Sequence, residues 1–99
     1  MLKKTPVKKT NKTSVVFAAL GLEDALEVGV AAEFNDWLPE TTPMKRRKDG
    51  SWAATVRLPK DERFEYCFVV DGKTWVADED ADALVPNPFG GKNSVCDLT

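Results

Sequence analysis

The chain has 99 residues, of which 42% are hydrophobic and 30% are charged, and its formal net charge is −2. This length supports one domain with a core of its own and excludes a catalytic barrel of roughly 250 residues. The composition is typical of a globular domain, and the lack of histidine excludes Ser/His and Cys/His catalysis.

The beginning of the chain differs in charge from the rest. Residues 1–14 contain five lysines and no acidic residue, whereas residues 15–99 contain nine basic and 16 acidic residues. We therefore expect residues 1–13 to form a flexible basic leader and residues 14–99 to form the folded domain. The lysines lack arginines or aromatic residues between them, so they favour a solvated leader over a nucleic-acid-binding arm.

The sequence shows no sign of secretion, membrane insertion or zinc binding. No apolar signal segment follows Lys3 and Lys4, and no run is long enough to span a bilayer, so we expect a cytoplasmic protein. Cys67 and Cys96 have no paired spacing, and a zinc site without histidine needs more thiols. We expect two free thiols, and a disulfide is possible only if their two strands are adjacent. We expect no cofactor.

Alternating apolar residues predict about seven short strands. They cover residues 14–20, 26–34, 44–48, 52–58, 64–70, 73–77 and 94–98. Asp49-Gly50 and Asp71-Gly72 are hairpin signals, and residues 85–93 are predicted to be a nonregular loop. Turn signals about every 8 to 12 residues, without helical periodicity, predict an all-β antiparallel β-sandwich.

The same alternation assigns core and solvent faces. From Leu26 to Phe34 the even-numbered residues face the core, and Trp52 faces the core in the strand that follows Asp49-Gly50. The charged run of residues 44–48 is predicted to be an edge strand whose charges discourage pairing with another molecule. A basic patch for phosphate is the alternative reading of that run.

Two tryptophans lie off the predicted core. Trp37 follows the end of a strand, and Trp75 follows the Asp71-Gly72 turn. Each is either a lid folded over the core or a platform for a ligand. An indole covers the apolar face of a sugar ring, and Asn or Lys side chains bond its hydroxyl groups. The loop with Phe89, Gly90, Lys92 and Asn93 supplies such groups, so the parts of a sugar site are present.

Carboxylates offer two weaker alternatives. Asp78, Asp80 and Asp82 have the spacing of a calcium loop, but Ala83 follows where that loop needs glycine. A solvated acidic loop is the preferred reading. The residue types alone do not exclude a pair of acids for glycoside hydrolysis, but the sequence has no scaffold that would form a cleft around such a pair.

Four motifs, in this order and at this spacing, resemble carbohydrate-binding module family 48. The motifs are Phe34-Asn35-Asp36-Trp37, Asp49-Gly50-Ser51-Trp52, the run from Tyr66 to Gly72, and the run from Asn87 to Val95. The resemblance extends from about Thr13 to the C-terminus. Members of this family are glycogen- and starch-binding domains of isoamylases, branching enzymes and the β subunits of AMP-activated protein kinase.

The resemblance implies an immunoglobulin-like early-set sandwich that binds α-1,4-linked glucan such as glycogen, starch or maltooligosaccharide. Trp37 and Trp75 match the two stacking platforms, and Asn93 matches the asparagine that bonds glucose hydroxyls. Phe89 and Gly90 match the loop beside the sugar, and Lys92 is a candidate cation. Two positions depart from the family pattern, because Cys67 stands in place of a lysine and Gly91 in place of a hydroxyl residue.

Three functions are therefore weighed. The first is a non-catalytic glucan-binding module that carries a glycogen- or starch-metabolising enzyme to its polymer. The second is a protein-interaction or scaffold domain of the same fold, with weak or no sugar binding. The third, a hydrolase, is suggested only by the enzymes to which relatives are fused, and this chain is too short to contain such an active site.

Overall fold

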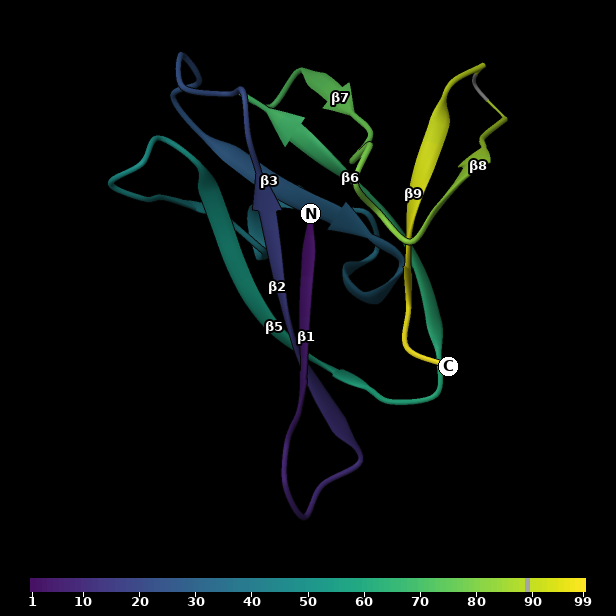
Figure 1. Cartoon of the computed structure of the whole chain (residues 1–99). Helices are drawn as coiled ribbons and strands as arrows, with labels where there is room; N and C mark the ends of the chain where they lie inside the picture. Colours follow the sequence, from purple (N-terminus) through teal and green to yellow (C-terminus); the bar gives the residue numbers. More distant parts are fainter. Residues whose placement is uncertain (89) are drawn as a thin grey trace.

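The computed structural model describes residues 1–88 and 90–99 of the chain as a two-layer antiparallel sandwich (Figure 1). Sheet A has the strand order β1-β2-β5-β4, and sheet B has the order β3-β6-β9-β8, with β7 paired to β6. The strands of sheet A are β1 (Leu2–Pro6), β2 (Lys12–Ala19), β5 (Trp52–Pro59) and β4 (Lys45–Arg46). Those of sheet B are β3 (Val28–Ala32), β6 (Arg63–Val70), β9 (Lys92–Asp97), β8 (Ala83–Pro86) and β7 (Thr74–Val76).

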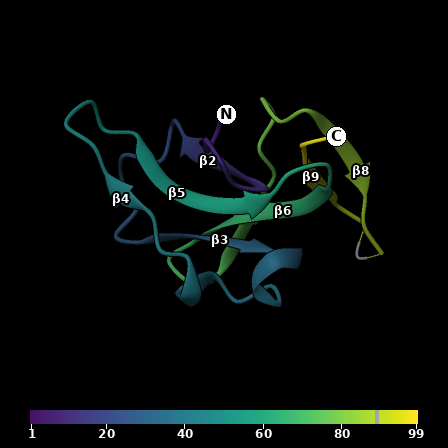
Figure 2. The ribbon, with the colours of Figure 1, turned by 90° about the horizontal axis from the view of Figure 1, so that it is seen from below.

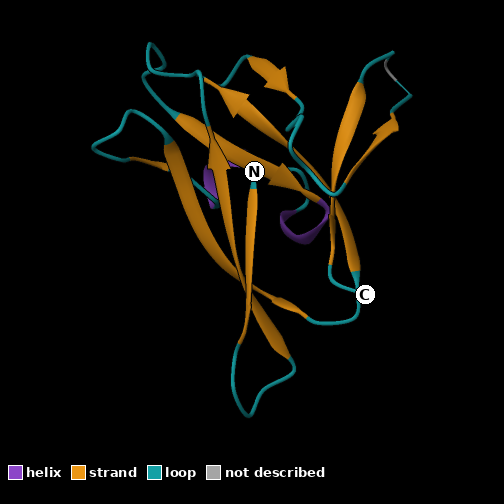
Figure 3. Cartoon of the chain, viewed as in Figure 1, coloured by secondary structure: helices purple, strands orange, loops and turns teal. Residues whose placement is uncertain are grey.

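Two short 3-10 turns, η1 (Glu33–Asn35) and η2 (Pro39–Thr41), follow β3. Figure 3 shows that strands and loops make up the rest of the described chain. In Figure 2, seen from below, β4 and β5 of sheet A lie above β3 of sheet B and the two turns. No helix in the described residues is long and apolar enough to cross a membrane. The predicted all-β sandwich is confirmed.

The core lies between the inner faces of the two sheets. Phe17 from β2 meets Tyr66 from β6 edge-on, with ring centroids 4.9 Å apart, and Phe68 packs against the other side of Tyr66 at 5.8 Å. Burying each such ring contributes about 1.5–3 kcal/mol. Trp52 is only 6% exposed, and its Nε1 donates to Leu22 O at 2.9 Å, so its predicted place in the core is confirmed.

The N-terminal segment differs from the predicted flexible leader. Leu2–Pro6 forms β1, which pairs antiparallel with β2 and sets Leu2 opposite Phe17. Leu2 packs against the core, and Lys4 Nζ bonds Asp82 Oδ2 at 2.6 Å and Asp97 O at 2.9 Å. The prediction of a flexible leader is wrong for these residues. Backbone hydrogen bonds to β2 and the apolar contact of Leu2 hold a strand that is otherwise polar.

Strand β3 is shorter than the predicted strand over 26–34. Leu26 is 88% exposed and is not a core residue. At the other end the side chain of Asn35 ends the strand, since its Oδ1 accepts from Ala32 N at 2.9 Å and its Nδ2 donates to Val30 O at 2.8 Å. Phe34 therefore lies in η1, yet its ring still packs 5.8 Å from those of Phe17 and Phe64.

Turn η2 folds over the outer face of sheet B at Gly29. A Cβ at Gly29 would lie 2.5 Å from Pro39 O and 2.9 Å from Pro39 Cβ, so only glycine allows this approach. Gly29 also forms an isolated bridge with Pro43. This contact fixes the segment that carries Trp37 against sheet B.

Two other predicted segments have clear outcomes. The run 44–48 contains β4, which lies at the edge of sheet A next to β5, so the predicted edge strand is confirmed. Within the predicted nonregular loop, Val85 and Pro86 belong instead to β8, which pairs with β9. The strands β1 and β8 are therefore additions to the seven that the pattern predicts.

Candidate functional site

The outer face of sheet B brings several predicted site residues together. Trp75 lies opposite Val69, which lies opposite Gly29 on β3. In the β6–β9 pair, Glu65 lies opposite Val95 and Tyr66 opposite Ser94. Because side chains alternate between faces, Glu65, Cys67 and Val69 point outward together with Trp75 and Asn93.

Sheet B divides at Cys67. The first half of β6 pairs with β9 and the last half pairs with β7, both on the same side of β6. At the top of Figure 1, β7 and the β8–β9 hairpin diverge from each other. Trp75 is carried on one branch and Asn93 on the other, so the outer face between them is not a regular flat sheet.

Trp75 is presented by a tight turn. Asp71 and Gly72 have positive φ values of 52° and 68°, and Lys73 N donates to Val70 O at 3.0 Å. The Asp71 Oδ1 atom also accepts from the backbone nitrogens of Leu26 and Glu27, at 2.8 and 2.9 Å. The turn is thus held in place, while the Trp75 side chain on the three-residue strand β7 remains 52% exposed.

Trp37 is held by an unusual backbone. It and Asp36 both have left-handed conformations, with φ of 61° and 57°, which costs about 1–2 kcal/mol for each non-glycine residue. Trp37 N donates to Ala32 O at 2.9 Å, and the residue is partly buried. Neither Trp37 nor Trp75 stacks on another aromatic ring among the described residues.

The two tryptophans lie at different heights along β6. Trp37 is bonded to Ala32, which pairs with Tyr66, whereas Trp75 pairs with Val69. These partners are three residues apart, which corresponds to roughly 10 Å along a strand. Asn93 is the neighbour of Ser94, which also pairs with Tyr66, so Asn93 lies at the level of Trp37 on the other side of β6.

The amide of Asn93 belongs to a hydrogen-bond network on this face. Its Nδ2 donates to Glu65 Oε1 at 3.1 Å, and its Oδ1 accepts from Asn87 Nδ2 at 3.3 Å and from Cys67 Sγ at 3.4 Å. Glu65 N donates to Glu33 Oε1 at 2.6 Å. Sequence reasoning missed Glu65, although its place two residues before Cys67 on an outward face could have indicated it.

The loop between β8 and β9 is organised by Asn87. Its backbone nitrogen donates to Gly91 O at 2.9 Å, and its Oδ1 accepts from Gly91 N at 3.1 Å. Gly90 is exposed with φ of 85°, as predicted for a loop glycine. Phe89, a predicted site residue, lies outside the described residues.

Lys92 is not on the face of Asn93. It pairs with Pro86 and directly precedes Asn93, so the alternation of β9 directs its side chain to the opposite side of the strand. Lys92 is exposed at the strand end, and its carbonyl accepts from Cys67 Sγ at 3.6 Å. The structure therefore brings Trp75 and Asn93 to one face, with Trp37 at its margin, and leaves Lys92 aside.

The two cysteines of sheet B are buried thiols. Burial raises the pKa of the Cys67 thiol, and the nearby Glu65 carboxylate raises this pKa further. Burial also raises the pKa of Cys96 to about 11. Both cysteines are free thiols, as predicted.

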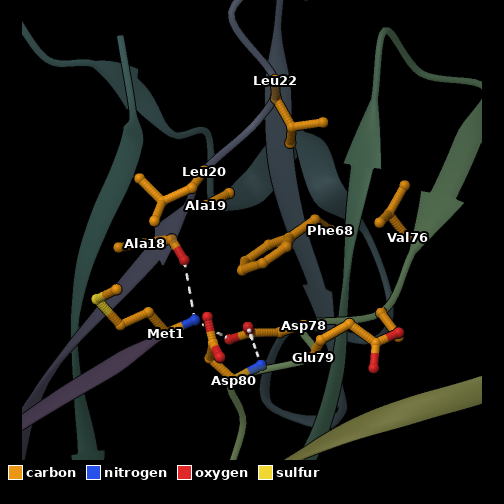
Figure 4. A pocket seen from close by; sticks show the side chains of 11 residues that line it. Met1, Ala18, Ala19, Leu20, Leu22, Phe68, Val76, Asp78, Glu79 and Asp80 are labelled. Atoms are coloured by element: carbon orange, nitrogen blue, oxygen red, sulfur yellow. Dashed lines mark hydrogen bonds and ion pairs between the residues drawn. The ribbon is translucent and has the colours of Figure 1, made fainter. Parts of the chain in front are cut away.

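The preferred reading of Asp78, Asp80 and Asp82 as a solvated acidic loop is wrong for Asp78, because its carboxylate serves structural contacts inside the fold. Asp78 is buried, and its carboxylate accepts from Tyr66 Oη at 2.6 Å and from the Met1 amino group (Figure 4). Burial and the Asp78 carboxylate raise the pKa of Tyr66 well above its usual range. Asp82 Oδ2 accepts hydrogen bonds from Lys4 Nζ and from Asp97 N. Among residues 1–88 and 90–99, no group of three potential metal ligands gathers.

Two hollows accompany these elements. One, of about 200 Å³, opens between the sheets beside Phe68, Val76 and Asp78, and Figure 4 shows the Met1 amino group at its wall. The other, of about 190 Å³, lies on the outer face of sheet B and is lined by Gly29, Pro39, Glu40 and Val69, among others. Val69, which lines this second hollow, is also the strand partner of Trp75.

Comparison with known proteins identifies the family. A family model described as carbohydrate-binding module 48 (isoamylase N-terminal domain) matches residues 5–88. The match includes Trp37 and Trp75 and ends before Asn93, and no curated protein sequence matches the chain. The matched segment covers most of the chain and folds as the sandwich described above, so the chain belongs to carbohydrate-binding module family 48.

Proposed function

We propose that this module binds α-1,4-linked glucan, without catalysis, on the outer face of sheet B. The observation that carries the proposal is the half-exposed Trp75 on the same face as the Asn93–Glu65 hydrogen bond. A half-exposed indole on this three-residue strand is a large apolar surface that a ligand can reach. Membership of a carbohydrate-binding family supports the same assignment.

The chemistry of this face suits a neutral sugar chain. The indole faces bury the apolar C–H surface of glucose rings, and a carboxylate accepts hydrogen bonds from hydroxyl groups. Glu65 has one oxygen bonded to Asn93 and retains acceptor capacity for a hydroxyl. With Glu33 and Glu65 on this side and Cys67 protonated, phosphorylated or uronic sugars are disfavoured by charge.

Binding to glucan is tested by retardation in native gels that contain glycogen or soluble starch. Stacking on one indole contributes about 1–1.5 kcal/mol, so we expect Trp75→Ala to raise the apparent Kd about tenfold. Trp37→Ala is expected to have a smaller effect, because its partly buried ring offers less surface.

Leu20→Ala is the matched control, since Leu20 is 61% exposed and lies away from the outer face of sheet B. Circular dichroism checks that each variant is folded. If the wild type is not retarded at high polysaccharide concentration, or if Leu20→Ala weakens retardation as much as Trp75→Ala, the proposal is wrong.

A second candidate is a protein-interaction or scaffold domain associated with a glycogen- or starch-metabolising enzyme. It is favoured by one observation: the amide oxygen of Asn93 already accepts two hydrogen bonds within the chain. A sugar hydroxyl would have to compete with them. Failure of glucan retardation in a folded wild-type protein would favour this candidate.

A further inference from the structure

Charge is divided between the two layers of the sandwich. Residues 1–19 and 45–59, which form the strands and hairpin turns of sheet A, contain ten of the chain's 14 basic residues and one of its 16 acidic residues. The remaining residues contain the other four basic and 15 acidic residues.

The outer face of sheet A carries one cation from each of its four strands. The residues whose side chains alternate outward include Lys3 on β1, Lys12 on β2, Arg57 on β5 and Lys45 on β4. All four are exposed, and no ion pair within the described residues neutralises any of them. These strands contain no acidic residue. The nearby acid Asp49 lies in the turn between β4 and β5.

Small neutral side chains lie between the cations. The register sets Thr5 beside Ser14 and Ser14 beside Arg57, and in the next row Val16 lies between Lys3 and Thr55. The hydroxyl groups of Thr5, Ser14 and Thr55 can donate hydrogen bonds, and Val16 offers partly buried apolar surface for packing. The face is thus cationic and able to bond acceptor oxygens.

The kind of anion follows from what this face lacks. None of its outward residues is aromatic, so it has no platform on which nucleic-acid bases stack and no ring to enter a membrane interface. Lysine cations beside hydroxyl donors and a small apolar centre suit a carboxylate-rich protein segment, which supplies acceptor oxygens and packing surface together.

We propose that the outer face of sheet A is a docking surface for an Asp/Glu-rich segment of a partner protein. Because the candidate glucan site lies on the outer face of sheet B, the two ligands occupy opposite sides of the sandwich and do not compete. The docking face does not depend on glucan binding, so each proposal stands or fails by its own measurement.

The test measures binding of fluorescein-labelled poly-L-glutamate by fluorescence anisotropy at low salt. We expect Arg57→Glu and Lys12→Glu each to weaken binding about tenfold, because a charge reversal places a like charge against the carboxylates. Lys73→Glu is the matched control: it makes the same charge change at an exposed residue in the turn before β7, and it should change the affinity less than twofold. Two variants on different strands guard against misfolding of one of them.

Three results would overturn the proposal. One is equal weakening by Lys73→Glu, which would mean attraction to net charge alone. Another is tighter binding of inorganic polyphosphate or of double-stranded DNA than of poly-L-glutamate, with the same loss in Arg57→Glu. The third is self-association of the wild-type protein in sedimentation velocity that Arg57→Glu abolishes, which would make a second copy the occupant.

Discussion

The outer faces of the two sheets are built differently. On sheet A, hairpin strands in regular register present cations, hydroxyls and small residues to solvent. On sheet B, Ala31, Cys67, Val69 and Val95 are almost completely buried although they point away from the sandwich core. Turn η2 packs over this face at Gly29, the strand partner of Val69. The difference teaches that a segment packed over the outside of a sheet gives that sheet a second buried face.

The largest effect is expected at the contact that covers sheet B. Gly29→Ala would place Cβ 2.5 Å from Pro39 O, so η2 must move, and we expect a loss of about 2–3 kcal/mol in the free energy of unfolding. Urea denaturation measures it. Ala53→Val is the matched control, because it adds volume to the open face of sheet A and should cost less than about 0.5 kcal/mol. Equal losses would show that the outer faces do not differ in packing.

A smaller effect is expected at the carboxylate that sequence reasoning missed. Glu65→Ala removes the acceptor of Asn93 Nδ2 and frees the amide to rotate, so we expect glucan binding to weaken about fivefold. Isothermal titration with a maltooligosaccharide measures this change. Glu62→Ala is the control, since the exposed Glu62 lies in the turn after β5 and its side chain makes no hydrogen bond within the described residues. If both variants bind like the wild type, Glu65 is not part of the site.

The last expected effect develops gradually at alkaline pH and again concerns sheet B, because both thiols lie on that sheet. Burial raises the pKa of Cys96 in the folded state to about 11, from an ordinary value of 9.0. The unfolded state therefore loses its proton first, and the free energy of unfolding falls as pH rises from about 9 to about 11.

The fall is at most about 1.4 kcal/mol per pH unit for one group. Urea denaturation at successive pH values measures it, and Cys96→Ala should flatten the slope over this range. A slope unchanged in that variant would assign the alkaline loss to other groups, such as Tyr66, whose pKa is also raised by burial.

Local pattern predicted much of this molecule. The alternation of Phe64, Tyr66 and Phe68 placed the central strand and its core face correctly, and Trp52 was assigned to the core. Asp71-Gly72 was recognised as a turn, which located Trp75. These residues were predictable because strand alternation and positive φ are properties of neighbouring residues in the chain.

Other features depended on contacts between distant residues. Nothing in the local sequence indicates that Leu2 would lie on a paired strand and pack against the core, or that Lys4 would bond Asp82. Lys92 was grouped with Asn93 because the two are adjacent, but adjacency on a strand places side chains on opposite faces. Glu65 became a site residue only through its bond to Asn93, 28 positions away.

The sequence by itself determined the family, the sandwich and the exclusion of histidine chemistry, because composition, alternation and motif order are carried by the residues alone. The tertiary structure decided which residues share a face. Sheet register brings Trp75, Glu65 and Asn93 together and separates the cations of sheet A from the acids of the other layer. Register is set by pairing between distant strands, and a shift of one residue would exchange the faces.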